Sequence, residues 1–296
     1  MFYNAIEYHE PLFRPPSEAY SFILQATFGC SWNECAFCEM YTSKKFKVKP
    51  FDEVKNDIEV AGNLNPGIKK VFLADGNVMV LSTKKLAVIL QELNFRFPSL
   101  ARISAYARPH DLENKTEEEL KSLVRMGLKL IYVGIETGDD ELLLRINKGD
   151  TYDSTKRNLL KARRAGLKIS AMILTGLGGF NYSTQHALNS AKIVNEIQPE
   201  FLSTLVLSFP FGIDHYKSRF DGEFIPLDLQ GLLKEQHRFI SSTKLEKVVF
   251  RSDHASNYLV LKGILNRDKK VMLKKLEEAI NMPSAAGLRQ EWQRGL

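Results

Sequence analysis

The stretch SFILQATFGCSWNECAFCEMY, residues 21–41, decides how the chain is interpreted. Its first part, residues 21–27, has the apolar character of a buried strand and leads directly into a loop that carries Cys30, Cys35 and Cys38. The 296-residue sequence holds no other cysteine. An odd number of thiols, clustered this tightly, argues against disulfides and favours a metal site.

Outward from this stretch, apolar strand-like segments alternate with helical ones as far as Gly212. The predicted strands are residues 21–27, 70–74, 102–105, 130–134, 168–174 and 201–207, and the predicted helices are residues 51–61, 83–94, 116–126, 151–165 and 183–196. This alternation, with short links, predicts an α/β fold with a parallel sheet that is either open or closed into a partial barrel. Ligands of such sheets bind beyond the carboxyl ends of the strands.

The pattern weakens after Gly212, where we expect only a strand at 248–250 and a helix at 267–280. We therefore predict a core over residues 1–212, which includes an N-terminal leader, and a C-terminal extension over residues 213–296 that covers the core. Residues 283–296 are expected to form a flexible tail.

Composition restricts the class of protein further. The chain is 44% hydrophobic and 26% charged, with a net charge of +6 spread along its length. The densest early basic cluster, Lys44, Lys45, Lys47 and Lys49, is expected to be a solvated loop, and a nucleic-acid-binding arm is the alternative. There is neither an apolar run of membrane-spanning length nor a secretory signal, so we expect a cytoplasmic protein without membrane contact.

The thiols themselves point to a cluster of iron and sulfur. Three thiolates can hold three corners of a [4Fe–4S] cluster and leave one iron open to a small molecule. The alternative is zinc held by three cysteines and one histidine, but none of the six histidines follows Cys38 within a few residues.

With the aromatic Phe37 directly before its last cysteine, the loop resembles that of the radical S-adenosylmethionine (SAM) superfamily, and the likeness extends over residues 15–212. The commonest spacing in the superfamily places three residues between the first two cysteines, whereas this chain has four, Ser31 to Glu34. We therefore expect a variant CX4CX2C subgroup of porphyrinogen-oxidase-like or elongator-like type. The resemblance implies a partial (β/α)6 barrel of TIM type, a [4Fe–4S] cluster on the three cysteines, and SAM.

The resemblance also assigns SAM contacts, chiefly at strand ends. Asp75, Gly76 and Asn77 match a glycine-rich segment that meets the SAM amino group, although a plain turn is the alternative. Glu136 would bind a ribose hydroxyl or the amino group, Lys148 or Arg145 would pair with the carboxylate, and Gly176 belongs to a stretch along the adenine. Phe37 would lie beside the cofactor. Arg145 has an equally simple interpretation as a charge at a helix end.

Three further residues are candidates for the substrate side. Arg108 is expected to contact a carboxylate of SAM or substrate, and Tyr106 lies beside it, with core packing as the alternative for Tyr106. His254, in the polar stretch 252–257, is the candidate proton donor or acceptor, although a structural turn explains it equally well.

The activity that the resemblance implies is reductive cleavage of SAM to a 5′-deoxyadenosyl radical, which takes hydrogen from an unidentified substrate. We expect a small metabolite as substrate and an electron donor such as flavodoxin or ferredoxin. One alternative is radical modification of RNA or of a protein side chain, although no RNA-binding module is visible. The other is a metal-binding or electron-transfer protein without SAM chemistry.

Overall fold

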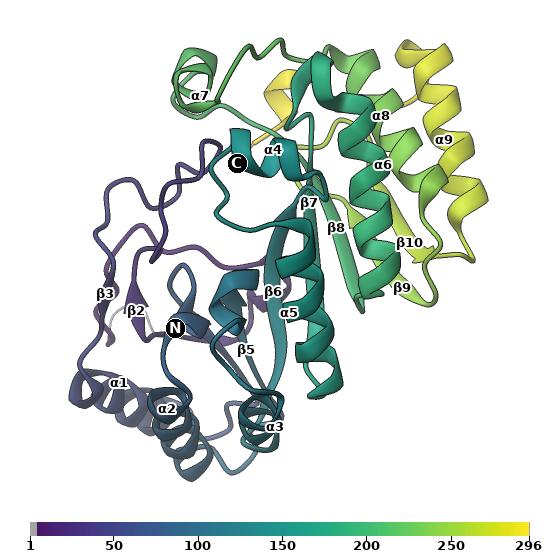
Figure 1. Cartoon of the computed structure of the whole chain (residues 1–296). Helices are drawn as coiled ribbons and strands as arrows, with labels where there is room; N and C mark the ends of the chain where they lie inside the picture. The colour runs from purple at the N-terminus through teal and green to yellow at the C-terminus, as the bar shows by residue number, and fades with distance from the viewer. Residues whose placement is uncertain (1–4, 296) are drawn as a thin grey trace. The chain divides into compact units, whose positions relative to one another are not determined.

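The computed structural model describes residues 5–295 (Figure 1). It has the α/β architecture predicted from the alternating segments, with a mostly parallel main sheet of eight strands. The chain divides into two compact units, which we describe separately. The first unit comprises Met1–Asn33, Cys38–Val133 and Arg157–Ile169, and the second comprises Glu34–Phe37, Gly134–Lys156 and Ser170–Leu296.

In the first unit, parallel strands follow one another in the order β1, β4, β5 and β6. Helices α1, α2 and α3 stand between them in the chain (Figure 1). The bounds are β1 Phe22–Gln25, β2 Thr27–Phe28, β3 Lys47–Val48, α1 Phe51–Leu64, β4 Lys70–Ala74, α2 Thr83–Arg96, β5 Arg102–Ala107, α3 Glu117–Arg125 and β6 Leu128–Glu136. The first unit also holds most of α5, Tyr152–Arg164.

Apart from β2 and β3, these elements form close to where the sequence pattern predicts them. Residues 71–74 of β4 are all buried, because a parallel strand has no solvent-facing side when both faces of the sheet are covered. Thr116 and Glu119 form the expected capping box at the start of α3. Gly127 then ends that helix at a φ of +99°, which favours glycine.

The ends of the cysteine loop are joined by a two-stranded antiparallel ladder that the sequence did not reveal. Thr27 pairs with Val48 and Phe28 pairs with Lys47, in strands β2 and β3. In and around β3, two residues of the basic cluster, Lys44 and Lys49, are buried, whereas Lys45 and Lys47 are exposed. The expectation of a wholly solvated loop was therefore wrong, since both buried amines pair with aspartates.

The second unit continues the parallel arrangement with β7, β8 and β9 and ends in an antiparallel pair of β9 with β10. Helices α6, α8 and α9 lie side by side (Figure 1). The bounds are α4 Asp140–Arg145, β7 Lys168–Thr175, α6 Gly179–Ile197, β8 Phe201–Val206, α7 Ile213–Arg219, α8 Leu229–Ser242, β9 Val248–Ser252, β10 Leu261–Leu265 and α9 Lys269–Asn281.

The structure differs from the predicted organisation in the C-terminal third. The boundary expected at Gly212 lies inside the second unit, and elements α4, α7, α8 and β10 were not predicted. The described part of the expected flexible tail packs on the chain before it: Arg289 donates to the carbonyls of His254 and Asn257, and Arg294 donates to that of Ser256. Within residues 5–295, no helix combines the length and the hydropathy needed to cross a membrane.

Candidate functional site

The cysteine loop belongs to both units of the chain. Cys30 and Cys38 lie in the first unit and are half-buried, whereas Cys35 lies in the second and is buried. None of the three forms a disulfide. No three His, Cys, Asp or Glu side chains of residues 5–295 are arranged as a set of metal ligands. The chemistry of the donors fits an iron–sulfur cluster nevertheless, because three thiols outside disulfides, in one short loop, are what such a cluster with one open iron requires.

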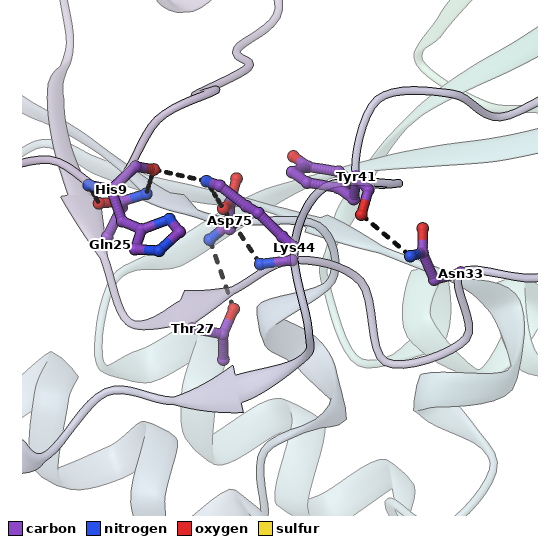
Figure 2. A network of polar contacts seen from close by, with 8 residues as sticks. His9, Gln25, Thr27, Asn33, Tyr41, Lys44 and Asp75 are labelled. Atoms are coloured by element: carbon purple, nitrogen blue, oxygen red, sulfur yellow. Dashed lines mark hydrogen bonds and ion pairs between the residues drawn. The ribbon is translucent and has the colours of Figure 1, made fainter.

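Asp75, directly after β4, holds the start of the cysteine loop (Figure 2). Its Oδ2 accepts hydrogen bonds from the Lys44 ammonium at 2.7 Å and from the backbone N–H of Gly29 at 3.2 Å. Both side chains of this ion pair are almost fully buried. The Lys44 ammonium also donates to the carbonyl of His9, whose backbone exchanges two hydrogen bonds with the Gln25 amide. Asp75 therefore anchors the chain one residue before Cys30, and its predicted contact with SAM stays a prediction.

Gly76 allows the cysteine loop to approach β4 closely. A Cβ atom at this position would lie 2.5 Å from the carbonyl oxygen of Gly29 and 2.7 Å from the Cα atom of Cys30. Asn77 continues the contact, since its Oδ1 accepts from the Ser31 N–H at 2.9 Å and its Nδ2 donates to the Ser31 hydroxyl at 2.7 Å. In this structure the Asp-Gly-Asn turn thus supports the loop, a role that its turn chemistry alone did not predict.

Asp111, which the sequence analysis did not identify, belongs to the same network of polar contacts as Asn77 in the first unit. It accepts hydrogen bonds from Asn77 Nδ2 at 2.8 Å and from the backbone N–H of Arg108 at 2.8 Å. Burial raises the pKa of Asp111 to about 6, against these hydrogen bonds and the charges of Arg108 and Lys115. The sequence did offer one signal for Asp111, because this residue lies shortly after the third predicted strand, where polar residues of a site are expected.

Arg108 and Tyr106 have different surroundings at the end of β5. The Arg108 guanidinium lies 4.8 Å from the centre of the Trp32 ring, in the cysteine loop. Tyr106 makes an edge-on ring contact with Phe72 at 5.0 Å and packs on a small apolar cluster. Burial raises the pKa of Tyr106 well above its ordinary value, so its hydroxyl stays protonated. The core contacts match the alternative interpretation of Tyr106.

Glu136 is the most informative predicted residue in the second unit. It ends β6 with a φ of +66° and is 3% exposed. Its Oε1 faces the Lys148 ammonium at 3.4 Å, and its buried Oε2 has no hydrogen-bond partner within residues 5–295. Burial raises the pKa of Glu136, and Lys148 opposes that shift. A buried carboxylate oxygen without a donor is costly, so this geometry fits a carboxylate that receives its last hydrogen bond from a ligand.

The surroundings of this pair explain two neighbouring residues. A Cβ atom on Gly134 would lie 1.9 Å from Glu136 Oε1, so only glycine leaves room for the carboxylate. The Lys148 ammonium lies 5.7 Å from the centre of the Phe37 ring, which itself packs on an apolar cluster of the second unit. Phe37 and Lys148 are thus brought together, as expected for two residues of one site.

Arg145 is engaged elsewhere, at the end of α4. Its Nε and Nη2 contact Glu141 at 3.2 and 2.9 Å, its Nη1 donates to the carbonyl of Asp221, and its guanidinium lies over the Tyr182 ring. These contacts agree with the interpretation of Arg145 as a charge at a helix end. The pairing of Lys148 or Arg145 with the SAM carboxylate stays a prediction.

Gly176 follows β7 with a φ of +85° and donates its N–H to Glu235 Oε1 at 2.6 Å. Glu235 lies on α8, the helix that was not predicted, and its Oε1 is 3.7 Å from Nε2 of the buried His186. His186 Nδ1 in turn lies 2.8 Å from the Thr137 hydroxyl. Gly176 also lines a cavity of about 500 Å³. Glu235 was missed because nothing in its polar helix marks it as buried.

His254 is half-buried in a turn of the second unit. Its Nδ1 lies 2.9 Å from the Ser256 hydroxyl and accepts from the Ser256 N–H at 3.1 Å. Burial and the nearby Arg289 lower the pKa of His254. These contacts match the structural turn that was the alternative, and a substrate-side role for His254 stays a prediction.

Comparisons with known proteins agree with this arrangement. The family model of the Radical SAM superfamily matches residues 24–191. The heme chaperone HemW of Bacillus subtilis is 24% identical over 165 residues, which are 53% of this chain and 43% of that protein, so the match spans less than half of the relative.

Two solved structures show a similar fold. Coproporphyrinogen III oxidase (HemN) from Escherichia coli superposes with a TM-score of 0.56 at 16% identity, over 75% of this chain and 52% of that one. Methylornithine synthase (PylB) does so with a TM-score of 0.53 at 14% identity, over 86% and 68%. Together with the three-cysteine loop after the first strand, the family match leads to one conclusion: this chain is a member of the radical SAM superfamily.

Proposed function

We propose that this protein is an enzyme that cleaves SAM reductively, with a [4Fe–4S] cluster held by Cys30, Cys35 and Cys38. Most members of the superfamily are enzymes. The observation that carries the proposal is the loop of three cysteines, none of them in a disulfide, inside the matched region 24–191. When bound, the cluster and SAM together supply a radical that removes hydrogen from an unreactive carbon.

The protein's own residues would bind and orient SAM. Lys148, buried beside Phe37, offers a cation to a carboxylate. Glu136 offers its unpartnered Oε2 to an ammonium or a ribose hydroxyl. Lys148 and Glu136 form a buried ion pair at 3.4 Å. When SAM binds, its carboxylate can replace Glu136 beside Lys148 and its ammonium can replace Lys148 beside Glu136, so no buried charge loses its counter-ion.

In the first unit, residues after β4 hold the cysteine loop in position. Asp75, Gly76 and Asn77 hold Gly29, Cys30 and Ser31 by hydrogen bonds and close backbone contact. Preorganised ligands bind a metal group with less loss of entropy than mobile ones. We therefore assign to Asp75 and Asn77 a positioning role toward Cys30.

The substrate is proposed to be a small molecule, and the electron donor a reduced flavodoxin or ferredoxin. The similar proteins do not point to one substrate, since one is a heme chaperone and another is coproporphyrinogen III oxidase. RNA or protein modification is the alternative, and the net charge of +6 is its only support. RNA binding that weakens steeply with added salt would favour that alternative.

Anaerobic reconstitution tests the proposal. We expect about four irons per chain, and 5′-deoxyadenosine should form when dithionite and SAM are added. Cys35→Ala should lose both the cluster and the product. The matched control is Thr42→Ala, because Thr42 is an exposed residue of the same loop whose side chain contacts only the carbonyl of Glu39. Stoichiometric zinc without 5′-deoxyadenosine would refute the proposal.

A further inference from the structure

A cavity of about 500 Å³ lies in the second unit, at the carboxyl ends of β7 and β8. Gly176 and residues 206–209 line it from the strand ends, and Glu291, Arg294 and Gly295 line it from the C-terminal segment. Its volume is within the range of pockets for small organic ligands, about 300–1,000 Å³. The carboxyl ends of parallel strands are where α/β proteins bind such ligands.

One side of the cavity is apolar. Phe209, Phe224 and Leu232 are among the residues that line it, with Val206, Leu207, Pro226 and Leu227. Phe209 and Phe224 are in edge-on contact at 6.1 Å, within an aromatic cluster that also packs around Tyr216. This wall suits the hydrocarbon or aromatic body of a ligand and offers nothing to its polar end.

The other side carries a partly buried cation. The Arg294 side chain is 15% exposed and lies 3.7 Å above the centre of the Tyr258 ring. Its Nε donates to the carbonyl of Ser256, and its Nη1 donates to Glu291 at 2.7 Å. The guanidinium is therefore held in place from three directions, and of its contacts the one to Glu291 is the one that an incoming anion can take over.

Glu291, the counter-ion of Arg294, is far less confined. Its side chain is 74% exposed, and an exposed ion pair contributes little free energy. Ser208, Ser256 and Tyr258 also line the cavity, and the Tyr258 hydroxyl donates to Glu291. Hydroxyl groups such as these can donate to an anion as well. An incoming carboxylate can therefore replace Glu291 on Arg294, whereas an incoming ammonium would have to compete with Arg294 itself for Glu291.

We propose that this cavity binds a small organic acid, with its apolar body against Phe209 and Phe224 and its carboxylate on Arg294 in place of Glu291. This acid is the substrate of the radical reaction, an identification that rests on the proposed function. Segment 289–295 then forms one wall of the substrate site, and the exposed Glu291 competes with the substrate for Arg294.

Three probes with the same aromatic body test the charge preference: 2-naphthylacetate, 2-naphthylacetamide and 2-(2-naphthyl)ethylamine. Their affinities are measured by calorimetry on the anaerobic holoenzyme without SAM. We expect the acetate to bind about tenfold more tightly than the acetamide, the usual effect of one charged hydrogen bond. Arg294→Gln should abolish that preference, and Glu291→Gln should strengthen acetate binding.

Arg289→Gln is the matched control. Arg289 fastens the same segment to the carbonyls of His254 and Asn257 but does not line the cavity. The variant should keep the acetate preference, so an equal loss in both arginine variants would mean that only the detachment of the segment matters, and would overturn the proposal. Equal binding of acetate and acetamide, tightest binding of the amine, or no binding of any probe would overturn it as well.

The two proposals fail in different ways. Because binding is measured without SAM, a protein that binds the acid but forms no 5′-deoxyadenosine contradicts the proposed function alone. A protein that cleaves SAM but shows no preference for the acetate contradicts the acid site alone.

Discussion

Replacing Lys44 by methionine tests whether the buried pair of Lys44 and Asp75 holds the cysteine loop. The change removes the ammonium and keeps most of the aliphatic stem. Asp75, which is 0% exposed, would then retain the Gly29 N–H as its remaining donor on Oδ2. We expect the variant to be less stable and the loop before Cys30 to be less ordered.

The magnitude follows from the burial of both partners. The two side chains are 1% and 0% exposed, and the ion pair measures 2.7 Å. Removing one partner of a buried ion pair leaves an uncompensated charge and typically costs about 3–5 kcal/mol. The double variant Lys44→Met with Asp75→Asn removes that charge as well, so it should be more stable than the sum of the single losses implies.

The pair of Lys49 and Asp57 is a matched control in the same unit. It is also a buried lysine–aspartate contact, but its aspartate lies on α1, away from the residues that touch Cys30. Lys49→Met should therefore lower the free energy of unfolding without loosening the cysteine loop.

Urea unfolding followed by fluorescence measures the stability of each variant. Hydrogen exchange of residues 29–33 and the iron bound after reconstitution measure the state of the loop. The reasoning would be refuted if Lys44→Met lost less than about 1 kcal/mol, the level of an exposed pair. It would also be refuted if Lys49→Met lowered iron uptake as much as Lys44→Met.

Three further predictions concern single residues. Because burial raises the pKa of Asp111 from 3.8 to about 6, its protonated form is favoured in the folded state, so the free energy of unfolding should fall by up to about 3 kcal/mol as the pH rises from about 4 to about 6. Asp111→Asn should flatten that part of the curve in urea titrations, and an unchanged slope would contradict the assignment. Glu136→Gln should weaken SAM binding about tenfold in anaerobic equilibrium dialysis, whereas Glu141→Gln, in an exposed pair on α4, should leave it unchanged. Gly76→Ala should cost about 1–3 kcal/mol and reduce iron uptake, because its methyl group would overlap the backbone of Gly29 and Cys30. Gly67→Ala, whose Cβ would meet only Asn65 Oδ1 at 3.3 Å, is the control, and equal iron loss in both would argue against the close approach.

The strand ends could be predicted because their signal is local. Residues 70–74 form β4 with the predicted bounds, and β7 begins at Lys168 as expected. Each such strand is a short apolar run that a polar or glycine-rich turn interrupts, and both parts of the pattern are visible in the sequence. The candidate residues that follow the strands, such as Asp75 and Glu136, were found for the same reason.

The contacts that hold the site could not be predicted because they join distant parts of the chain. Nothing in a lysine-rich loop distinguishes Lys44, which meets Asp75 31 residues later, from the exposed Lys45. Glu235 reaches Gly176 across 59 residues from a helix that was not predicted. A missed helix hides every tertiary contact of its side chains, whatever their charge.

Hydrogen-bond accounting separates the two carboxylates that the sequence made equivalent. Asp75 and Glu136 both follow buried strands, and both were assigned to SAM. Asp75 receives an ammonium at 2.7 Å and a backbone N–H of its own unit on Oδ2, while its buried Oδ1 has no partner among the described residues. Glu136 receives one long contact of 3.4 Å from Lys148 and keeps a buried oxygen without a donor among the described residues. Since an unsatisfied buried carboxylate oxygen lowers stability, an apolar residue would suit β6 better if the strand had only to fold. The cost at both carboxylates is explained if a ligand supplies a missing donor, but Asp75 already has two donors that fix the cysteine loop, whereas Glu136 has a single long contact. Glu136 therefore has fewer structural contacts to explain its burial, and it is the sharper test of the assignment of SAM to this chain.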